Sequence, residues 1–201
     1  MKIHLFAALL AVLTAASASA TSATERWLDP TCFAVNRAPM RTSFIVFPTA
    51  AAAVPENDYT RSPLYRTLNG EWAFLRADRP GAEPEGFFRV GYDDSSWGTM
   101  PVPGIWELNG YGDPVYTNKP YPWHKFFEVK APLVPHEQNY TGLYRRTLEI
   151  PAGWEGRDTF IHIGSAISNV TLWVNGREVG YSEDSKLEAE FDVTRYITPG
   201  R

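Results

Sequence analysis

The sequence predicts an all-β protein built as a two-sheet sandwich, and two observations lead to that class. Short segments of alternating apolar and polar residues follow one another, separated by turns rich in Gly, Pro and Asn. No segment carries the apolar period of a long helix. The composition agrees, because 44% of the 201 residues are apolar and 14% are aromatic, which is enough to build a core. The only cysteine, Cys32, excludes an intramolecular disulfide, so the fold depends on that core.

Residues 1–20 have the features of an export signal. A positively charged start is followed by a short apolar run at residues 5–13 and by the small-residue triplet Ala-Ser-Ala that ends at Ala20. The apolar run is too short to cross a bilayer and no later segment is long enough, so we expect no membrane span. We expect an exported protein, periplasmic or secreted, that begins at Thr21.

The rest of the chain divides into a leader and one domain. Residues 21–60 are expected to lack regular structure, because the stretch at 48–58 is low in complexity and rich in alanine. From residue 61 onward, apolar alternation and turn residues begin. The sandwich is therefore expected over residues 61–201.

The first predicted strand lies within residues 67–78. It places Trp72 and Phe74 on one face of an extended segment. The long, turn-rich stretch that follows contains Trp97 and Trp106, which we expect to anchor the core.

Another strand is predicted over residues 142–151. Its alternation puts Tyr144, Leu148 and Ile150 on one side, although Arg146 interrupts the apolar pattern on that side. We expect this side to face the interior.

The clearest element is a hairpin within residues 158–182. Every second residue from Val170 to Val174 is apolar, and the alternation runs up to Asn175-Gly176. This pair is the preferred sequence for a two-residue type I′ turn, in which both residues have a positive φ. The pattern predicts two antiparallel strands joined at that turn.

The last predicted strand lies within residues 189–197 and ends where Thr194 is placed to cap a short helical turn. A Pro-Gly turn then precedes Arg201, at a point where the next strand of a sandwich should begin. We therefore expect a fragment whose sandwich is incomplete at its C-terminal end.

Several classes of function are disfavoured by the sequence. A net charge of −4 and a pI near 5.6, with no run of like charge, argue against a nucleic-acid partner. The histidines are scattered, so no metal site of ordinary ligand spacing is predicted. The chain also lacks a Gly-rich phosphate loop and a G-x-S-x-G nucleophile elbow.

The remaining catalytic candidates are the acidic pairs Asp93-Asp94, Glu183-Asp184 and Glu188/Glu190. Asp93-Asp94 precedes Ser-Ser-Trp in a turn, where capping of backbone N–H groups is the favoured role. Glu183 and Asp184 are expected to bond backbone groups where a strand leaves the hairpin. The chain's own residues therefore predict no catalytic site.

Three separated motifs carry a family resemblance. They are GIWELNGYGDPVYTNKPYP at residues 104–122, YRRTLEIP at 144–151 and LWVNGREVGYSEDSKLEAEFDVT at 172–194. In this order they resemble the N-terminal sugar-binding domain of glycoside hydrolase family 2, over about residues 64–201. The resemblance implies a jelly-roll β-sandwich. In the complete protein it implies an immunoglobulin-like domain and a (β/α)₈ barrel whose two glutamates carry out a retaining hydrolysis.

Within that family the chain most resembles the β-galactosidases, because GYSEDSKLEAEFD at 180–192 and PVYTNKPYPW at 114–123 follow their form. The function so implied is that of the non-catalytic first domain of an exported β-galactosidase, with a β-galactoside and the barrel domain as its partners. Two alternatives stay open. One is a free-standing lectin-like module that binds a glycan without cleaving it, and the other is the same domain of a β-glucuronidase or β-mannosidase.

The resemblance also assigns a role to the loop at residues 112–123, which completes one wall of the barrel's active site in this family. Asn118 matches the asparagine that hydrogen-bonds the galactosyl unit, whereas Asp113 matches as a turn-former. The alternative for Asn118 is that its amide only satisfies its own turn. No cofactor is expected in this chain, and sodium and magnesium are expected only in the full-length enzyme.

Overall fold

The computed structural model describes residues 23–53, 58–114 and 133–200. Within these ranges most of the regular structure is extended, and the helices are short. The strands are β1 (Ala34–Val35), β2 (Gly70–Ala77), β3 (Gly98–Val102), β4 (Thr141–Arg145), β5 (Phe160–Ile163), β6 (Asn169–Val174), β7 (Arg177–Glu183) and β8 (Ala189–Asp192). The helices are η1 (Ala23–Leu28), α1 (Ala50–Ala53), η2 (Tyr59–Arg61), η3 (Glu107–Asn109), η4 (Ala152–Trp154) and η5 (Thr194–Tyr196). The predicted all-β class is confirmed.

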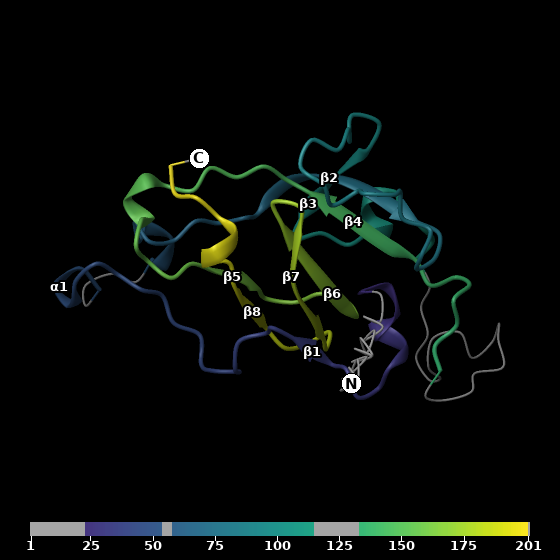
Figure 1. Ribbon diagram of the computed structural model, residues 1–201, viewed down its shortest axis with the longest axis horizontal. Coiled ribbons are helices and arrows are strands. Elements are labelled where there is room, and N and C mark those ends of the chain that lie inside the picture. Colours follow the sequence, from purple (N-terminus) through teal and green to yellow (C-terminus); the bar gives the residue numbers. More distant parts are fainter. Residues whose placement is uncertain (1–22, 54–57, 115–132, 201) are drawn as a thin grey trace, which may run out of the picture.

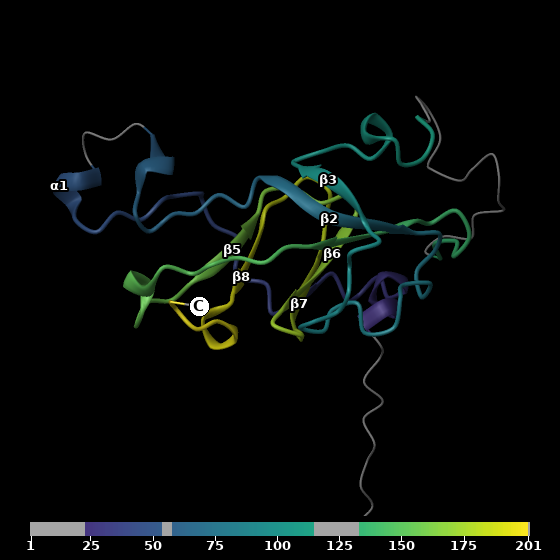
Figure 2. The same ribbon diagram turned by 90° about the horizontal axis from the view of Figure 1, so that it is seen from above.

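The strands of the described residues pair in antiparallel sheets of the orders β1-β7-β6, β3-β2-β4 and β5-β8. Figures 1 and 2 show the sheet of β2, β3 and β4 on one side of the β6–β7 hairpin, with β5 and β8 beside the hairpin. Antiparallel sheets that bury apolar side chains between them form a β-sandwich. The predicted sandwich architecture is confirmed.

The main core lies between the β6–β7 hairpin and the β5–β8 pair. Val179 of β7 is 2% exposed, Phe191 of β8 is 0% exposed and Val193 just after β8 is 1% exposed. Leu172 of β6 packs against the same cluster. A Cβ on Gly180 would overlap the backbone oxygen of Val35 and the Phe191 ring, so this position needs a glycine.

The hairpin forms where the sequence predicts it. Asn175 and Gly176 join β6 to β7 with φ angles of 50° and 77°, as a type I′ turn requires. The Asn175 side chain also contacts η5, because its Nδ2 donates a hydrogen bond to the backbone oxygen of Tyr196 at 2.7 Å. The turn therefore holds the end of η5 as well as the two strands.

The leader is more regular than predicted. The expectation that residues 21–60 lack regular structure is wrong at β1, which pairs with the edge of β7 and sets Val35 opposite Tyr181. Arg26 of η1 adds an ion pair to Glu178 of β7 at 2.5 Å. A two-residue strand has no readable pattern of its own, and the unpaired edge of β7 is what orders it.

The strand predicted over residues 142–151 is shorter and faces differently. β4 ends at Arg145, and within it Leu143 is 3% exposed whereas Tyr144 is 38% exposed. The predicted face included Leu148 and Ile150, which lie beyond β4 and do not pair with β2. Only the residues up to Arg145 are held in register by β2, with Leu143 opposite Leu75.

The predicted cap at Thr194 is also corrected. Thr194 is the first residue of η5, and its backbone N–H donates to Oδ1 of Asp192 at 2.9 Å. The Thr194 hydroxyl instead accepts the backbone N–H of Thr159 at 2.8 Å. Asp192 is the acceptor because its carboxylate lies two residues before the free N–H, the usual spacing for this kind of turn.

Candidate functional site

Asn118, the one site residue predicted from the sequence, lies outside the described residues, as does the rest of 115–132. The structure does describe both ends of the chain segment that contains it. One end runs from the close of β3 through η3 to Pro114, and the other runs from Leu133 into β4. The candidate site is therefore built from these two ends and from the sheet that holds them.

Four aromatic side chains hold the outgoing end against the sheet, and we call them the aromatic base: Phe74, Trp106, Tyr111 and Tyr144. Phe74 of β2 is 0% exposed and lies at the centre. Its ring centroid is 5.6 Å from that of Trp106, 4.6 Å from that of Tyr111 and 4.8 Å from that of Tyr144. Such edge-on and tilted contacts stabilise aromatic pairs beyond their buried area. Trp106, predicted to be a core residue, is half-buried in this cluster.

Hydrogen bonds fix the orientation of these rings. The indole Nε1 of Trp106 donates to the Tyr144 hydroxyl at 2.6 Å. The Tyr111 hydroxyl donates to the backbone oxygen of Thr99 on β3 at 3.3 Å. Burial raises the pKa of the Tyr144 phenol, and the hydrogen bond from Trp106 only partly offsets this. The phenol therefore stays neutral at physiological pH and remains available as an acceptor.

Two glycines make room for the aromatic base. A Cβ on Gly142 of β4 would overlap the Trp106 ring and would approach Cε2 of Phe74 to 3.0 Å. A Cβ on Gly98 of β3 would overlap the Tyr111 hydroxyl. Both close approaches need the absence of a side chain, which is a common reason for a glycine inside a strand.

Arg76 of β2 lies next to both ends of the segment. On the outgoing side, a Cβ on Gly112 would lie 3.0 Å from Nη1 of Arg76, and Gly112 has a φ of 89°. On the returning side, the Arg76 guanidinium lies over the Tyr140 ring, 4.3 Å from its centroid. A guanidinium over an aromatic face is attracted by the ring quadrupole. One β2 side chain thus contacts the segment where it leaves the sheet and where it returns.

The acidic pair Asp93-Asp94 has structural partners. Oδ1 of Asp93 accepts the backbone N–H of Ser95 at 3.0 Å, and hydrogen bonds from the Ser95 side chain and N–H lower the Asp93 pKa. Asp94 forms an ion pair with Arg145 of β4 at 3.0 Å. The predicted capping role is confirmed for Asp93, whereas Asp94 links the turn to a side chain of β4.

Glu183 and Asp184 also bond within the fold. The buried Tyr181 hydroxyl donates to Oε1 of Glu183 at 2.5 Å, and burial, followed by the bond and charge of Glu183, raises the Tyr181 pKa far above its ordinary value. Oδ1 of Asp184 accepts the backbone N–H of Lys186 at 2.8 Å. The predicted bond to a backbone group is confirmed for Asp184, whereas Glu183 bonds the side chain of Tyr181.

Glu188 and Glu190 hold the leader to β8. Nη2 of Arg41 contacts Oε1 of Glu190 at 2.6 Å, and the Ser43 hydroxyl donates to Oε2 of Glu188 at 2.7 Å. His162 of β5 lies beside both, with its Nδ1 3.3 Å from Glu190 and its Nε2 3.8 Å from Glu188. Over the described residues, no group of three or more His, Cys, Asp or Glu side chains has the geometry to hold a metal ion.

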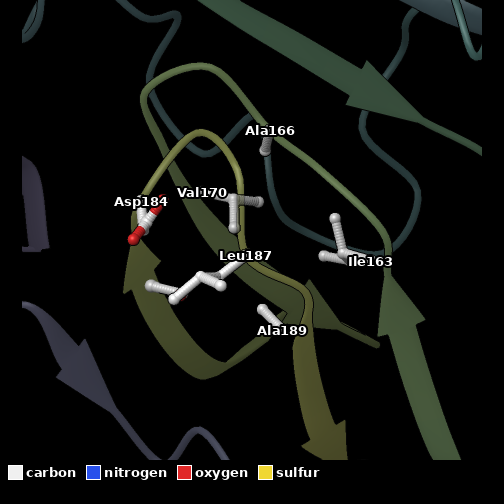
Figure 3. A pocket seen from close by; sticks show the side chains of 7 residues that line it. Ile163, Ala166, Val170, Asp184, Leu187 and Ala189 are labelled. Atoms are coloured by element: carbon white, nitrogen blue, oxygen red, sulfur yellow. The ribbon is translucent and has the colours of Figure 1, made fainter. Parts of the chain in front are cut away.

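A shallow depression lies near the open end of the β6–β7 hairpin (Figure 3). Its labelled lining is mostly aliphatic and consists of Ile163, Ala166, Val170, Asp184, Leu187 and Ala189. Asp184 is the only ionisable side chain among its lining residues, so the depression lacks the acid and base pair that hydrolysis requires.

In the part of the chain that is described, no helix has both the length and the apolar character to cross a membrane.

Sequence reasoning named every ring of the aromatic base except Tyr111, but it did not find the residues that make room for these rings or contact the segment beside them. Tyr111, Gly98, Gly142 and Arg76 were not singled out, because each matters only through partners far away in the sequence. The loop itself was marked by the resemblance of its motif at residues 114–123, which gives no information about its supports.

Comparisons with known proteins agree with the motifs. The family model described as "Glycosyl hydrolases family 2, sugar binding domain" matches residues 65–201. A β-galactosidase of Halalkalibacterium halodurans is 35% identical over 90% of this chain and 18% of its own length. A β-galactosidase of Pectobacterium atrosepticum is 40% identical over 87% of this chain and 16% of its own. The chain thus spans less than a fifth of the length of these relatives.

Solved structures are more distant. A β-glucuronidase 2 of Bacteroides uniformis covers 68% of this chain with 22% identity and a TM-score of 0.47, and the match takes in 13% of that structure. A likeness of this size carries no argument about substrate.

Proposed function

Because the chain belongs to the sugar-binding domain family of the family 2 glycosyl hydrolases, we propose that it is the non-catalytic first domain of an exported β-galactosidase. In the full-length protein, two glutamates outside this chain hydrolyse terminal β-galactosides with retention of configuration. The domain contributes the loop at residues 112–123 to the wall of the sugar site. In that loop, the Asn118 amide bonds a hydroxyl of the galactosyl unit.

The choice of a galactoside is supported by the relatives. The β-galactosidase of Halalkalibacterium halodurans aligns with nearly all of this chain, and that of Photobacterium profundum is 43% identical over 67% of it. The motif at residues 180–192 and the loop motif at 114–123 also have the β-galactosidase form.

The observation that carries the loop's role is its support by the aromatic base. The segment leaves the sheet against Phe74, through Trp106 and Tyr111, and both of its ends contact Arg76. Anchoring both ends of a loop reduces the entropy lost when the loop binds a ligand. The contacts at the described ends of the segment therefore support the proposed role of the loop.

The Asn118 side chain suits the proposed contact. Its amide can donate from nitrogen and accept at oxygen, so it can pair with a sugar hydroxyl in either direction. Sodium and magnesium stay proposals for the full-length enzyme, because the described residues of this chain offer no ligand cluster. No step of the proposed mechanism passes through a metal here.

The test is Asn118→Ala in the full-length protein. Loss of one or two neutral hydrogen bonds in a closed site should lower kcat/KM by about one to two orders of magnitude, or roughly 1–3 kcal/mol. The thermal midpoint should change little, since a loop contact of this kind adds little to the core. Wild-type kinetics for Asn118→Ala on every galactoside tried would remove the loop from the sugar site and favour the lectin-like alternative.

The matched control is Asn175→Ala. It removes the hydrogen bond to Tyr196 and the residue best suited to a positive φ at the hairpin turn. It should lower stability and leave KM unchanged. A rise in KM with this variant would show that the assay reports unfolding and not sugar binding.

Export is proposed from residues 1–20 alone, and its test is independent of the kinetics. N-terminal sequencing of protein recovered from outside the cytoplasm should start at Thr21. Exported protein that retains Met1 would overturn the proposal.

A further inference from the structure

The chain contains three Asn-Gly pairs, and the structure treats them differently. They are Asn69-Gly70, Asn109-Gly110 and Asn175-Gly176. In such a pair the glycine nitrogen can attack the asparagine side chain, because no Cβ on the glycine obstructs the approach. The structure therefore allows the chemical fate of three equivalent sequences to be compared within one fold.

Two of the three side chains are held in place. Nδ2 of Asn109, the last residue of η3, donates to the backbone oxygen of Ile105 at 2.8 Å. Nδ2 of Asn175 donates to the backbone oxygen of Tyr196 at 2.7 Å. Either amide has to break its hydrogen bond before its carbon can turn toward the following nitrogen.

Asn69 is different. All three asparagines are exposed, but within the described part of the chain the Asn69 side-chain amide has no hydrogen bond, while its backbone N–H donates to the Thr67 hydroxyl at 3.1 Å. Gly70 follows with a φ of 127°, a conformation that other residues rarely adopt. The side chain is thus free to rotate, whereas the peptide that would attack it is fixed.

Arg146 acts on that same peptide. Nη1 of Arg146 donates to the backbone oxygen of Leu68 at 2.8 Å and to that of Asn69 at 3.2 Å. When the Gly70 nitrogen loses its proton, the negative charge is shared with the Asn69 oxygen. A guanidinium bonded to that oxygen stabilises the charge and so promotes attack.

We propose that Asn69 is the modification site at which the folded chain deamidates. The Gly70 nitrogen bonds to Cγ of Asn69, the bond from Cγ to Nδ2 breaks, and the side-chain nitrogen leaves as ammonia. The Gly70 proton passes to solvent and the leaving group takes up a proton. Water then opens the resulting succinimide to aspartate or isoaspartate, and no atom is oxidised or reduced.

The product changes the start of β2. Isoaspartate adds one backbone methylene just before Gly70, which lies opposite Val102 in the ladder with β3. In the same turn, the backbone oxygen of Leu68 accepts a hydrogen bond from the indole N–H of Trp72 at 2.9 Å. Isoaspartate at residue 69 therefore alters the register between β2 and β3, whereas aspartate leaves the backbone intact beside Arg146.

The test is peptide mapping of the full chain during incubation at mildly alkaline pH, with mass spectrometry and chemical detection of isoaspartate. Asn69 should convert first, with a mass gain of about one dalton in its peptide and a rate several-fold above those of Asn109 and Asn175. The same incubation in urea should bring the three rates close together, because unfolding frees every side chain. Equal rates in the folded chain, or faster conversion at Asn109 or Asn175, would overturn the proposal.

Arg146→Gln tests the role of the guanidinium. It should slow conversion at Asn69 and leave Asn109 unchanged in the same sample, which makes Asn109 an internal control for folding. An unchanged or faster rate at Asn69 would contradict the assignment to Arg146. General unfolding by the variant would reveal itself as faster conversion at all three sites.

Discussion

At the scale of single residues, the packing that supports the loop at 112–123 depends on two glycines, which carry no Cβ atom. Gly142 lets the Trp106 ring lie on Phe74, and Gly98 lets the Tyr111 hydroxyl reach β3. The hydrogen bond from the Trp106 indole to the Tyr144 hydroxyl fixes the orientation of these two rings. Close packing and a few oriented hydrogen bonds together define where the loop leaves the sheet.

Gly142→Ala should therefore destabilise the protein. The new methyl group would overlap Trp106 and crowd Phe74, and overpacking of this kind costs about 1–3 kcal/mol. Chemical denaturation monitored by tryptophan fluorescence measures the change in the free energy of unfolding. In the full-length enzyme we also expect KM for galactosides to rise, because the loop would be displaced at its base.

Gly153→Ala is the matched control for this prediction. Gly153 lies in η4, and a Cβ there meets nothing within 4 Å. The free energy of unfolding should change by no more than about 0.5 kcal/mol. If the two variants had equal stability, the close approach at Gly142 would not be what maintains the aromatic base.

At the scale of elements, short strands depend on the contacts at their ends. β8 passes into η5 through Asp192, whose carboxylate accepts the backbone N–H of Thr194. Hydrogen bonds from the Thr194 side chain and N–H lower the Asp192 pKa below 3.8. β1 pairs with the other edge of β7, so a segment predicted to be irregular completes this sheet.

The lowered pKa of Asp192 predicts an acid dependence of stability. The charged carboxylate binds its partners better in the folded chain, so its contribution is present above pH 3.8 and is lost as the pH falls through the lower, folded value. Asp192→Asn keeps an acceptor oxygen but does not titrate. We expect urea denaturation between neutral and acid pH to show a smaller loss of stability for Asp192→Asn than for wild type. An identical pH profile for the two proteins would contradict this role.

At the scale of the whole molecule, the acidic pairs of the described residues have partners within the fold. Asp93 accepts a backbone N–H, Glu183 accepts the Tyr181 hydroxyl and Glu190 pairs with Arg41 of the leader. The aromatic base and Arg76 instead direct support toward one loop. This arrangement fits a domain that assists an active site built elsewhere.

The chain by itself should therefore hydrolyse no chromogenic β-galactoside. Hydrolysis with retention needs an acid and a nucleophile on either side of the bond, and the described residues offer no such pair. Rigorously purified chain, assayed against the same amount of full-length enzyme, measures this directly. Turnover by the chain alone would require a catalytic pair within these residues and would refute the proposed division of labour.

The sequence alone was sufficient to predict the features that depend only on neighbouring residues. The alternation at 170–174 with Asn175-Gly176 predicted the hairpin and its turn, because strand period and type I′ geometry depend on neighbouring residues. The turn role of Asp93 was predictable for the same reason. The family was also readable from three motifs, and the family model matches the same region.

Only the tertiary structure decided which distant residues meet. The sequence could not show that β1 pairs with β7, that β4 ends at Arg145 with Leu143 facing inward, or that Gly142 admits Trp106. Each of these is a contact between segments separated by tens of residues, and none leaves a local period in the chain. Pairing across a sheet and close packing of rings arise from the folded arrangement, which is why the support of the loop became visible only there.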